Sequence, residues 1–313
     1  MKYGTLKVFS GSSHAAFVNA ICATLGISPG QREILKFSNE NIMVKIQENV
    51  RGDDIFVVQT MAPPVNENII EALIMIDALK HASAGRITAV LPYFPYARSD
   101  KKDQPRISIS ARLMADLFEA AGANRFLTMN LHCPQIQGFF RIPSDQLIGG
   151  PIVVDYLKQK DLGKAVLVAS DAGEIKDITH YANRLDLPIA IIDKRRYGND
   201  EKPKARNIIG DIAGKDAYLI DDEIASGGTM LEAMDFLLKM GAASVACGAI
   251  HGVLTGNAAE KLTRSPAREI VVCDTIPVEH KKTEKMKVLT VAPMFAQAIQ
   301  RIHLGRSISE LFR

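Results

Sequence analysis

Short apolar runs rich in β-branched residues alternate with stretches of helical periodicity along this chain of 313 residues. Runs such as 165–169 and 245–250 are apolar at nearly every position, whereas 67–82 and 229–240 have apolar residues at helical spacing. A strand that is apolar on both faces must be covered on both faces, as in a parallel sheet flanked by helices. The alternation therefore predicts an α/β fold.

The expected elements follow from these runs and from the turn residues between them. We expect strands at residues 6–10, 55–60, 87–92, 126–130, 165–169, 189–193, 217–221, 245–250, 270–274 and 288–291, and helices at residues 67–82, 108–121, 177–185, 229–240 and 294–302.

Composition and charge exclude several classes of protein. Lys and Arg number 38 against 35 Asp and Glu, and a net charge of +3 is too small to predict a nucleic-acid-binding surface. No apolar run reaches the roughly 20 residues of a membrane-spanning helix, and the first residues lack the apolar core of a signal peptide. The four cysteines (Cys22, Cys133, Cys247 and Cys273) are widely spaced. This spacing favours reduced thiols and a cytoplasmic location over a disulfide or zinc scaffold.

Two segments of the chain resemble each other. "AGANRFLTMNLH" ends at His132 and "MGAASVACGAIH" ends at His251, and a glycine followed by a strand precedes each. The pattern predicts two similar α/β units, and chance similarity between two βαβ units is the competing interpretation. The first copy is longer because of a basic loop at 96–106. We expect domains at 1–148 and 149–313, with the last helix able to pack back on the first domain.

The stretch "LIDDEIASGGTM" at 219–230 carries the strongest chemical signal. An apolar strand leads to two acids, a turn of small residues and a helix, which creates a ligand crevice at the carboxyl end of a parallel strand. Backbone N–H groups at the helix start can surround a phosphate, and Gly227 and Gly228 allow close approach and a positive φ. An acid-rich turn that caps a helix is the competing interpretation. The residues expected to bind a sugar phosphate are Asp221, Asp222, Ala225, Ser226, Gly227, Gly228 and Thr229.

This stretch resembles the ribose-phosphate loop of the phosphoribosyltransferase superfamily. Further segments, in the same order, are similar to the ribose-phosphate diphosphokinase family: "FSNENIMVKIQENVRG" at 37–52, "YFPYARSDKKDQPR" at 93–106, "MNLHCPQIQGFF" at 129–140, "IDKRR" at 192–196 and the ending "SISELF". The resemblance covers essentially the whole chain. It implies two similar phosphoribosyltransferase-like domains, each a mostly parallel sheet flanked by helices.

The resemblance also implies a reaction. The family transfers diphosphate from MgATP to the 1-hydroxyl of ribose 5-phosphate, giving 5-phosphoribosyl 1-diphosphate and AMP for nucleotide biosynthesis. Self-association from dimers to hexamers is implied as well, with neither nucleic acid nor membrane as a partner. The alternatives are a catalytically weak or regulatory paralogue and a nucleobase phosphoribosyltransferase.

Several polar and aromatic residues fit a nucleotide. Phe37 offers a ring for adenine, Asn39 an amide for a base edge, and Arg98 a planar fork for phosphate oxygens. A buried aromatic side chain, a surface ion pair and a core histidine are the ordinary explanations for such residues. The resemblance implies that ATP contacts Phe37, Asn39, Glu40, Asn41, Arg98, Ser99, Asp100 and His132.

Metal and catalytic residues are expected beside these groups. Asp171 follows the strand 165–169, where it can hold Mg²⁺ or cap a helix, and the resemblance adds His132 as a second ligand. Lys194 and Arg196 follow the strand 189–193 and are expected to be catalytic, Arg196 also contacting ribose 5-phosphate. A solvated cationic run is the competing interpretation.

The chain departs from the family pattern at a few positions. Asn41 stands where an acid is customary, with Glu40 one place early, and Ser99 replaces a glutamine. Glu174 replaces the second glycine of a Gly-Gly pair, and Ala225 replaces an acid in the ribose loop. We expect the ribose loop to remain functional and the nucleotide affinity to be altered.

Overall fold

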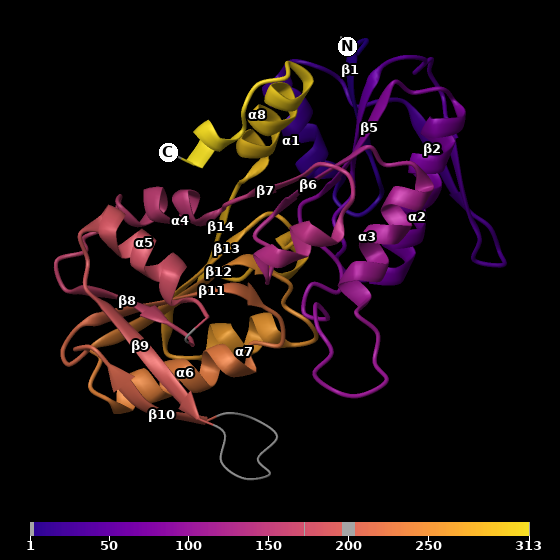
Figure 1. Ribbon diagram of the computed structural model, residues 1–313. Helices are drawn as coiled ribbons and strands as arrows, with labels where there is room; N and C mark the ends of the chain where they lie inside the picture. The colour runs from indigo at the N-terminus through magenta and orange to yellow at the C-terminus, as the bar shows by residue number, and fades with distance from the viewer. Residues whose placement is uncertain (1–2, 172, 196–203, 313) are drawn as a thin grey trace. The chain divides into compact units, whose positions relative to one another are not determined.

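Two units make up the chain in the computed structural model, which describes residues 3–171, 173–195 and 204–312 (Figure 1). Unit 1 comprises Met1–Ile148, Thr275–Pro277 and Thr290–Arg313. Unit 2 comprises Gly149–Asp274 and Val278–Leu289. No helix in the described part of the chain is both long and apolar enough to cross a membrane.

Unit 1 is built on a five-stranded sheet of order β1-β4-β5-β6-β7, in which all neighbours are parallel. Its strands are β1 (Leu6–Ser10), β4 (Asp54–Val58), β5 (Arg86–Leu91), β6 (Arg125–Met129) and β7 (Ser144–Leu147). Its helices are α1 (Ala15–Leu25), α2 (Val65–His81), α3 (Ser110–Ala121) and α8 (Ala292–His303), with short 3-10 turns η1 (Pro134–Phe139) and η3 (Ser309–Phe312).

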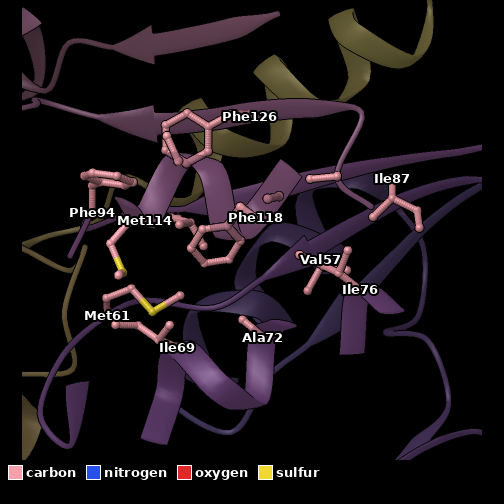
Figure 2. Close-up of a cluster of buried hydrophobic side chains, with 14 of the residues drawn as sticks. Val57, Met61, Ile69, Ala72, Ile76, Ile87, Phe94, Met114, Phe118 and Phe126 are labelled. Carbon is pink, nitrogen blue, oxygen red and sulfur yellow. The ribbon is translucent and has the colours of Figure 1, made fainter. Parts of the chain in front are cut away.

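The core of unit 1 lies between its sheet and helices α2 and α3 (Figure 2). Phe118 of α3 is fully buried, and Phe126 of β6 stacks on Phe140 with ring centroids 4.2 Å apart. The other face is covered by α1 and α8, whose Phe17 and Phe295 meet edge to face at 5.5 Å. This second contact attaches the end of the chain to unit 1.

A separate antiparallel hairpin lies beside this sheet. It consists of β2 (Arg32–Lys36) and β3 (Ile42–Ile46), with Lys36 opposite Ile42. The ion pair between Lys36 and Glu67, 2.9 Å long, ties the turn of the hairpin to the first turn of α2. That end of α2 follows the carboxyl end of β4.

Unit 2 contains a seven-stranded sheet of order β10-β9-β8-β11-β12-β13-β14, antiparallel only between β10 and β9. Its strands are β8 (Ala165–Ala169), β9 (Ile189–Arg195), β10 (Lys204–Ile209), β11 (Asp216–Ile224), β12 (Ser244–Gly252), β13 (Ala267–Cys273) and β14 (Met286–Leu289). Its helices α4 (Gly150–Leu157), α5 (Ile175–Leu185), α6 (Gly228–Lys239) and α7 (Ala258–Arg264), together with the 3-10 turn η2 (Glu279–Lys281), cover both faces (Figure 1).

The predicted α/β class is confirmed, and every expected strand and helix is present with ends shifted by a few residues. The order β4-β5-β6-β7 in unit 1 matches the order β8-β11-β12-β13 in unit 2. The two copies of the sequence repeat therefore occupy equivalent places in their sheets, β6 before His132 and β12 around His251. The strands β2, β3, β7 and β10 and the helices α1, α4 and α7 have no counterpart among the ranges expected above.

Candidate active site

The residues of unit 2 that the sequence predicts for the sugar and the metal lie near the carboxyl ends of β8 and β11. These strands are parallel neighbours, and Ala169 lies opposite Ile220. Ser170 therefore follows beside Asp221, and the loops that leave both strands begin at the same edge of the sheet. This edge is where ligands bind in open α/β sheets.

Three carboxylates meet at this edge. Glu174, Asp221 and Asp222 each place one oxygen within 4.8 Å of the others. The N–H of Asp222 donates to Oδ1 of Asp221 at 2.8 Å, and the Ser170 hydroxyl donates to its Oδ2, also at 2.8 Å. The sequence signal for Glu174 was an acid placed directly before a helix at a strand end, and this position was not predicted as part of the site.

Burial and the proximity of other acids disfavour the charged forms of Glu174 and Asp221. Burial, followed by the charges of Asp222 and Asp221, raises the pKa of Glu174 from 4.5 to about 8. Burial and the neighbouring Asp222 also raise the pKa of Asp221. A cation placed among the three oxygens would relieve both penalties, because carboxylates are the ligands that hard divalent cations prefer.

Asp171 lies in the same loop but outside this group of three. Its Oδ1 accepts the N–H of Gly173 at 2.8 Å, which closes a short turn before α5, and the residue is exposed. His132, the other predicted metal ligand, belongs to unit 1. There it is exposed in the segment that follows β6.

The glycine turn between β11 and α6 has the conformation of a helix start. Gly227 has φ of 75°, and its carbonyl accepts the N–H of Leu231 at 2.9 Å. Gly228 is already the first helical residue and does not have a positive φ, so the expectation of a positive φ at both glycines is wrong for Gly228. Ser226, Gly228 and Thr229 are exposed. Since the first N–H groups of a helix have no acceptor within it, this accessible turn offers donors to an anion.

The loop that follows β12 is hydrogen-bonded to the segment that leads into the glycine turn. The N–H of Leu254 donates to Ile224 at 3.0 Å, and the N–H of Thr255 donates to Ala225 at 2.9 Å. Ala225 is half-buried and its carbonyl is used in this contact.

In unit 1, the first group of predicted nucleotide residues forms the turn of the β2–β3 hairpin. Phe37 is 50% exposed, although the side chain is large and apolar. Its N–H donates to the carbonyl of Asn41, and Oδ1 of Asn39 accepts the Asn41 N–H at 3.2 Å. Glu40 has a positive φ of 66°, which suits a tight turn. The turn therefore presents the Phe37 ring to solvent on a fixed backbone.

The second group lies in the loop after β5. Arg98 is exposed, and Ser99 is held at both backbone groups, donating to Tyr96 at 2.9 Å and accepting from Ala111 at 3.2 Å. The Tyr96 hydroxyl donates to Oδ1 of Asn66 at 2.6 Å. Asn66 adjoins Glu67, the partner of Lys36, so both predicted nucleotide groups are attached to the start of α2.

Asp100 links this loop to the segment after β6. Burial, together with a hydrogen bond from the thiol to Asp100, raises the pKa of Cys133. Cys133 directly follows His132, so Asp100 and His132 lie near each other at the carboxyl edge of the unit 1 sheet. The structure thus brings the predicted nucleotide residues of unit 1 to the region of the α2 start and the carboxyl edge of the sheet.

Lys194, one of the two predicted catalytic residues, lies near the end of β9. The strand continues to Arg195, beyond the expected end at 193, and the backbone of Lys194 pairs with Ala205 of β10. Arg196 lies outside the described residues.

Comparisons with known proteins agree with this arrangement. Residues 6–122 match the N-terminal domain of ribose phosphate pyrophosphokinase, and residues 195–313 match the phosphoribosyl synthetase-associated domain. A ribose-phosphate pyrophosphokinase of Caldanaerobacter subterraneus is 49% identical, and one of Clostridium acetobutylicum is 47% identical. Each match covers 98% of this chain, and 98% and 97% of those proteins.

The fold has a close counterpart among solved structures. The crystal structure of phosphoribosylpyrophosphate synthetase from Mycobacterium smegmatis superposes with a TM-score of 0.91 at 38% identity, over 96% of this chain and all of that one. The architecture is therefore that of an enzyme built from two phosphoribosyltransferase-like domains. The chain belongs to the ribose-phosphate pyrophosphokinase family, and the predicted resemblance is confirmed.

Proposed function

We propose that this enzyme transfers the β,γ-diphosphate of MgATP to the 1-hydroxyl of ribose 5-phosphate, for nucleotide biosynthesis. A bond forms between the sugar O1 and the β-phosphorus, the bond from that phosphorus to the α,β-bridging oxygen breaks, and AMP leaves. The proposal is carried by the strand-end arrangement of unit 2, in which three carboxylates and an accessible glycine turn lie at one sheet edge in a chain of this family.

The glycine turn is assigned to the 5-phosphate. Donors are offered by the backbone of Ala225, Ser226, Gly227, Gly228 and Thr229 and by the Thr229 hydroxyl. One charge at a helix end contributes only about 0.3–1 kcal/mol, so several donors must act together. Asp221 and Asp222 lie at the same strand end and are assigned to the sugar hydroxyls, whose hydrogens they can accept.

The acidic residues fit a divalent metal. Their donor atoms are all carboxylate oxygens, and the raised pKa of Glu174 reflects its burial and then the charges of Asp222 and Asp221. Glu174, Asp221 and Asp222 would hold Mg²⁺ in unit 2, and His132 and Asp171 remain the proposed ligands toward the nucleotide. Bound Mg²⁺ supplies positive charge against the phosphate oxygens.

Nucleotide binding is assigned to the unit 1 edge. The exposed Phe37 ring would stack on adenine, with Asn39, Glu40 and Asn41 in the same turn at the base edge. Arg98, Ser99 and Asp100 would face the phosphates. Lys194 and Arg196 would neutralise charge that develops on the transferring diphosphate, since in phosphoryl transfer the protein chiefly aligns groups and stabilises charge.

We further propose that the enzyme acts in the cytoplasm and assembles into dimers and hexamers. The four cysteines are unpaired, which suits a reducing compartment. Nothing in the described residues favours a regulatory paralogue or a nucleobase phosphoribosyltransferase.

The test is a reconstitution with pure protein, ATP, Mg²⁺ and ribose 5-phosphate, followed by quantification of AMP and 5-phosphoribosyl 1-diphosphate. We expect equal amounts of the two products and none when the sugar is left out. The variant Asp222→Asn should lose most of this activity, whereas Glu232→Gln, an exposed charge change on α6, should retain it. AMP release that does not depend on the sugar would refute the proposal.

A further inference from the structure

Ser170 is a buried hydroxyl at the edge of the proposed sugar site. It is the first residue after β8 and is only 2% exposed. Its hydroxyl donates to Oδ2 of Asp221 at 2.8 Å. At this burial the hydroxyl has little access to water, so Asp221 is the partner that satisfies it.

With this hydrogen bond, both oxygens of the Asp221 carboxylate have a donor. Oδ1 of Asp221 accepts the N–H of Asp222, and Oδ2 accepts the Ser170 hydroxyl. With a donor at each oxygen, the plane of the carboxylate is fixed as well as its position. Without the hydroxyl, only a contact to the adjacent residue would remain, and the repulsion from the Asp222 carboxylate would favour rotation of Asp221 away from it.

The same bond connects two loops that are far apart in the sequence. Ser170 directly precedes the turn in which Asp171 accepts the N–H of Gly173, and that turn leads to Glu174. Asp221 opens the stretch that leads to the glycine turn and α6. The Ser170–Asp221 bond thus joins the start of the loop after β8 to the last part of β11, which leads to the glycine turn.

We propose that Ser170 is a positioning residue for the sugar: it orients Asp221 for ribose 5-phosphate and does not touch the substrate itself. This inference depends on the proposed function. Because the 5-phosphate is held elsewhere and the nucleotide residues lie in unit 1, the loss of the hydroxyl should weaken sugar binding and leave ATP binding unchanged.

The experiment compares Ser170→Val with Ser170→Thr, side chains of the same shape that differ by one hydroxyl, and adds Ser170→Ala, which removes only the oxygen. Initial rates give KM for ribose 5-phosphate, KM for ATP and kcat. Thermal unfolding of each variant shows that it is folded. We expect the Val and Ala variants to raise KM for ribose 5-phosphate about tenfold, which corresponds to about 1.4 kcal/mol. The Thr variant should stay within about threefold of the parent, and KM for ATP should change less than twofold.

Each outcome bears on the proposal. Equal KM values for the sugar in folded Val, Ala and Thr variants would overturn it, as would an equal rise in KM for both substrates. If the Val variant does not fold, the Ala and Thr pair decides in the same way. A parent protein that forms no AMP at all would instead refute the proposed function, so the two failures are distinguishable.

Discussion

Replacement of Glu174 by Gln tests whether the folded protein raises the pKa of this carboxyl group in the acidic cluster of unit 2. The parent keeps a proton on Glu174 up to a pKa of about 8, whereas the unfolded chain loses it near 4.5. Between these values the folded state binds more protons, so the contribution of this group to the free energy of unfolding falls as pH rises. Glutamine keeps the shape and cannot ionise. The variant should therefore gain stability relative to the parent as pH rises from about 5 to 8, and the gain should level off above about 8.5.

The size of the effect follows from the shift and from solvent exposure. Each pH unit between the two pKa values corresponds to about 1.4 kcal/mol. Converting the whole pKa shift into free energy would overestimate the effect, because the Glu174 side chain is only partly buried and water screens its neighbours. We expect a stability difference of about 2 kcal/mol at pH 9 and close to zero at pH 5.

Urea unfolding in EDTA at several pH values measures this difference directly. Glu232→Gln serves as the control, because it removes the same charge from an exposed position on α6. Added Mg²⁺ should stabilise the parent more than the Glu174 variant, since binding to the folded state alone adds about 2.7 kcal/mol at one hundred times Kd. A stability difference that does not change with pH, or that falls as pH rises, would refute the reasoning.

Three other substitutions test separate parts of the structure. Lys194→Ala should lower kcat about 10²–10³-fold with little change in KM for ribose 5-phosphate, and steady-state kinetics at saturating ATP would disprove the assignment if kcat were unchanged. Gly227→Ala places a side chain at φ of 75°, which costs about 1–2 kcal/mol. It should raise KM for ribose 5-phosphate, whereas Gly305→Ala, at φ of 67° near the chain end, should not. Asp54→Asn disrupts a fully buried carboxylate that pairs with Arg86 at 2.6 Å and with His303 at 2.8 Å. It should lower the free energy of unfolding by about 3–5 kcal/mol, and a loss below about 1 kcal/mol in urea titrations would contradict this account.

The sequence predicted the fully buried strands β4 and β8, and it missed polar strands at the edges of the sheets. The central strand β8 is buried at all five positions, and its apolar run defined its ends correctly. By contrast, β7 and β10 lie at the edges of their sheets and have the polar sequences SDQL and KARNII. An edge strand buries less of its surface, so its sequence resembles that of a loop.

For the candidate site, the sequence could place only the residues that a strand end positions by itself. Asp221 and Asp222 were found because they directly follow an apolar run, and the carboxyl ends of parallel strands share one edge. The participation of Glu174 and Ser170 depends on which strand neighbours which. That order, β8 beside β11, comes from pairing across about fifty residues of sequence and is not contained in any local pattern.

The two histidines of the sequence repeat lie at equivalent positions but differ in burial, because the strands that precede or contain them differ in length. Both follow the same motif, and β6 and β12 occupy equivalent places in their sheets. β6 ends at Met129, so His132 lies beyond the sheet and is exposed. β12 continues to Gly252, which keeps His251 inside the strand, opposite Glu223 and 3% exposed. A metal or phosphate ligand must be accessible, and His251 is buried, whereas Asp221 and Asp222, which also lie within a strand, are only partly buried. Accordingly the first histidine is the one that we assign to chemistry, and the second is part of the sheet.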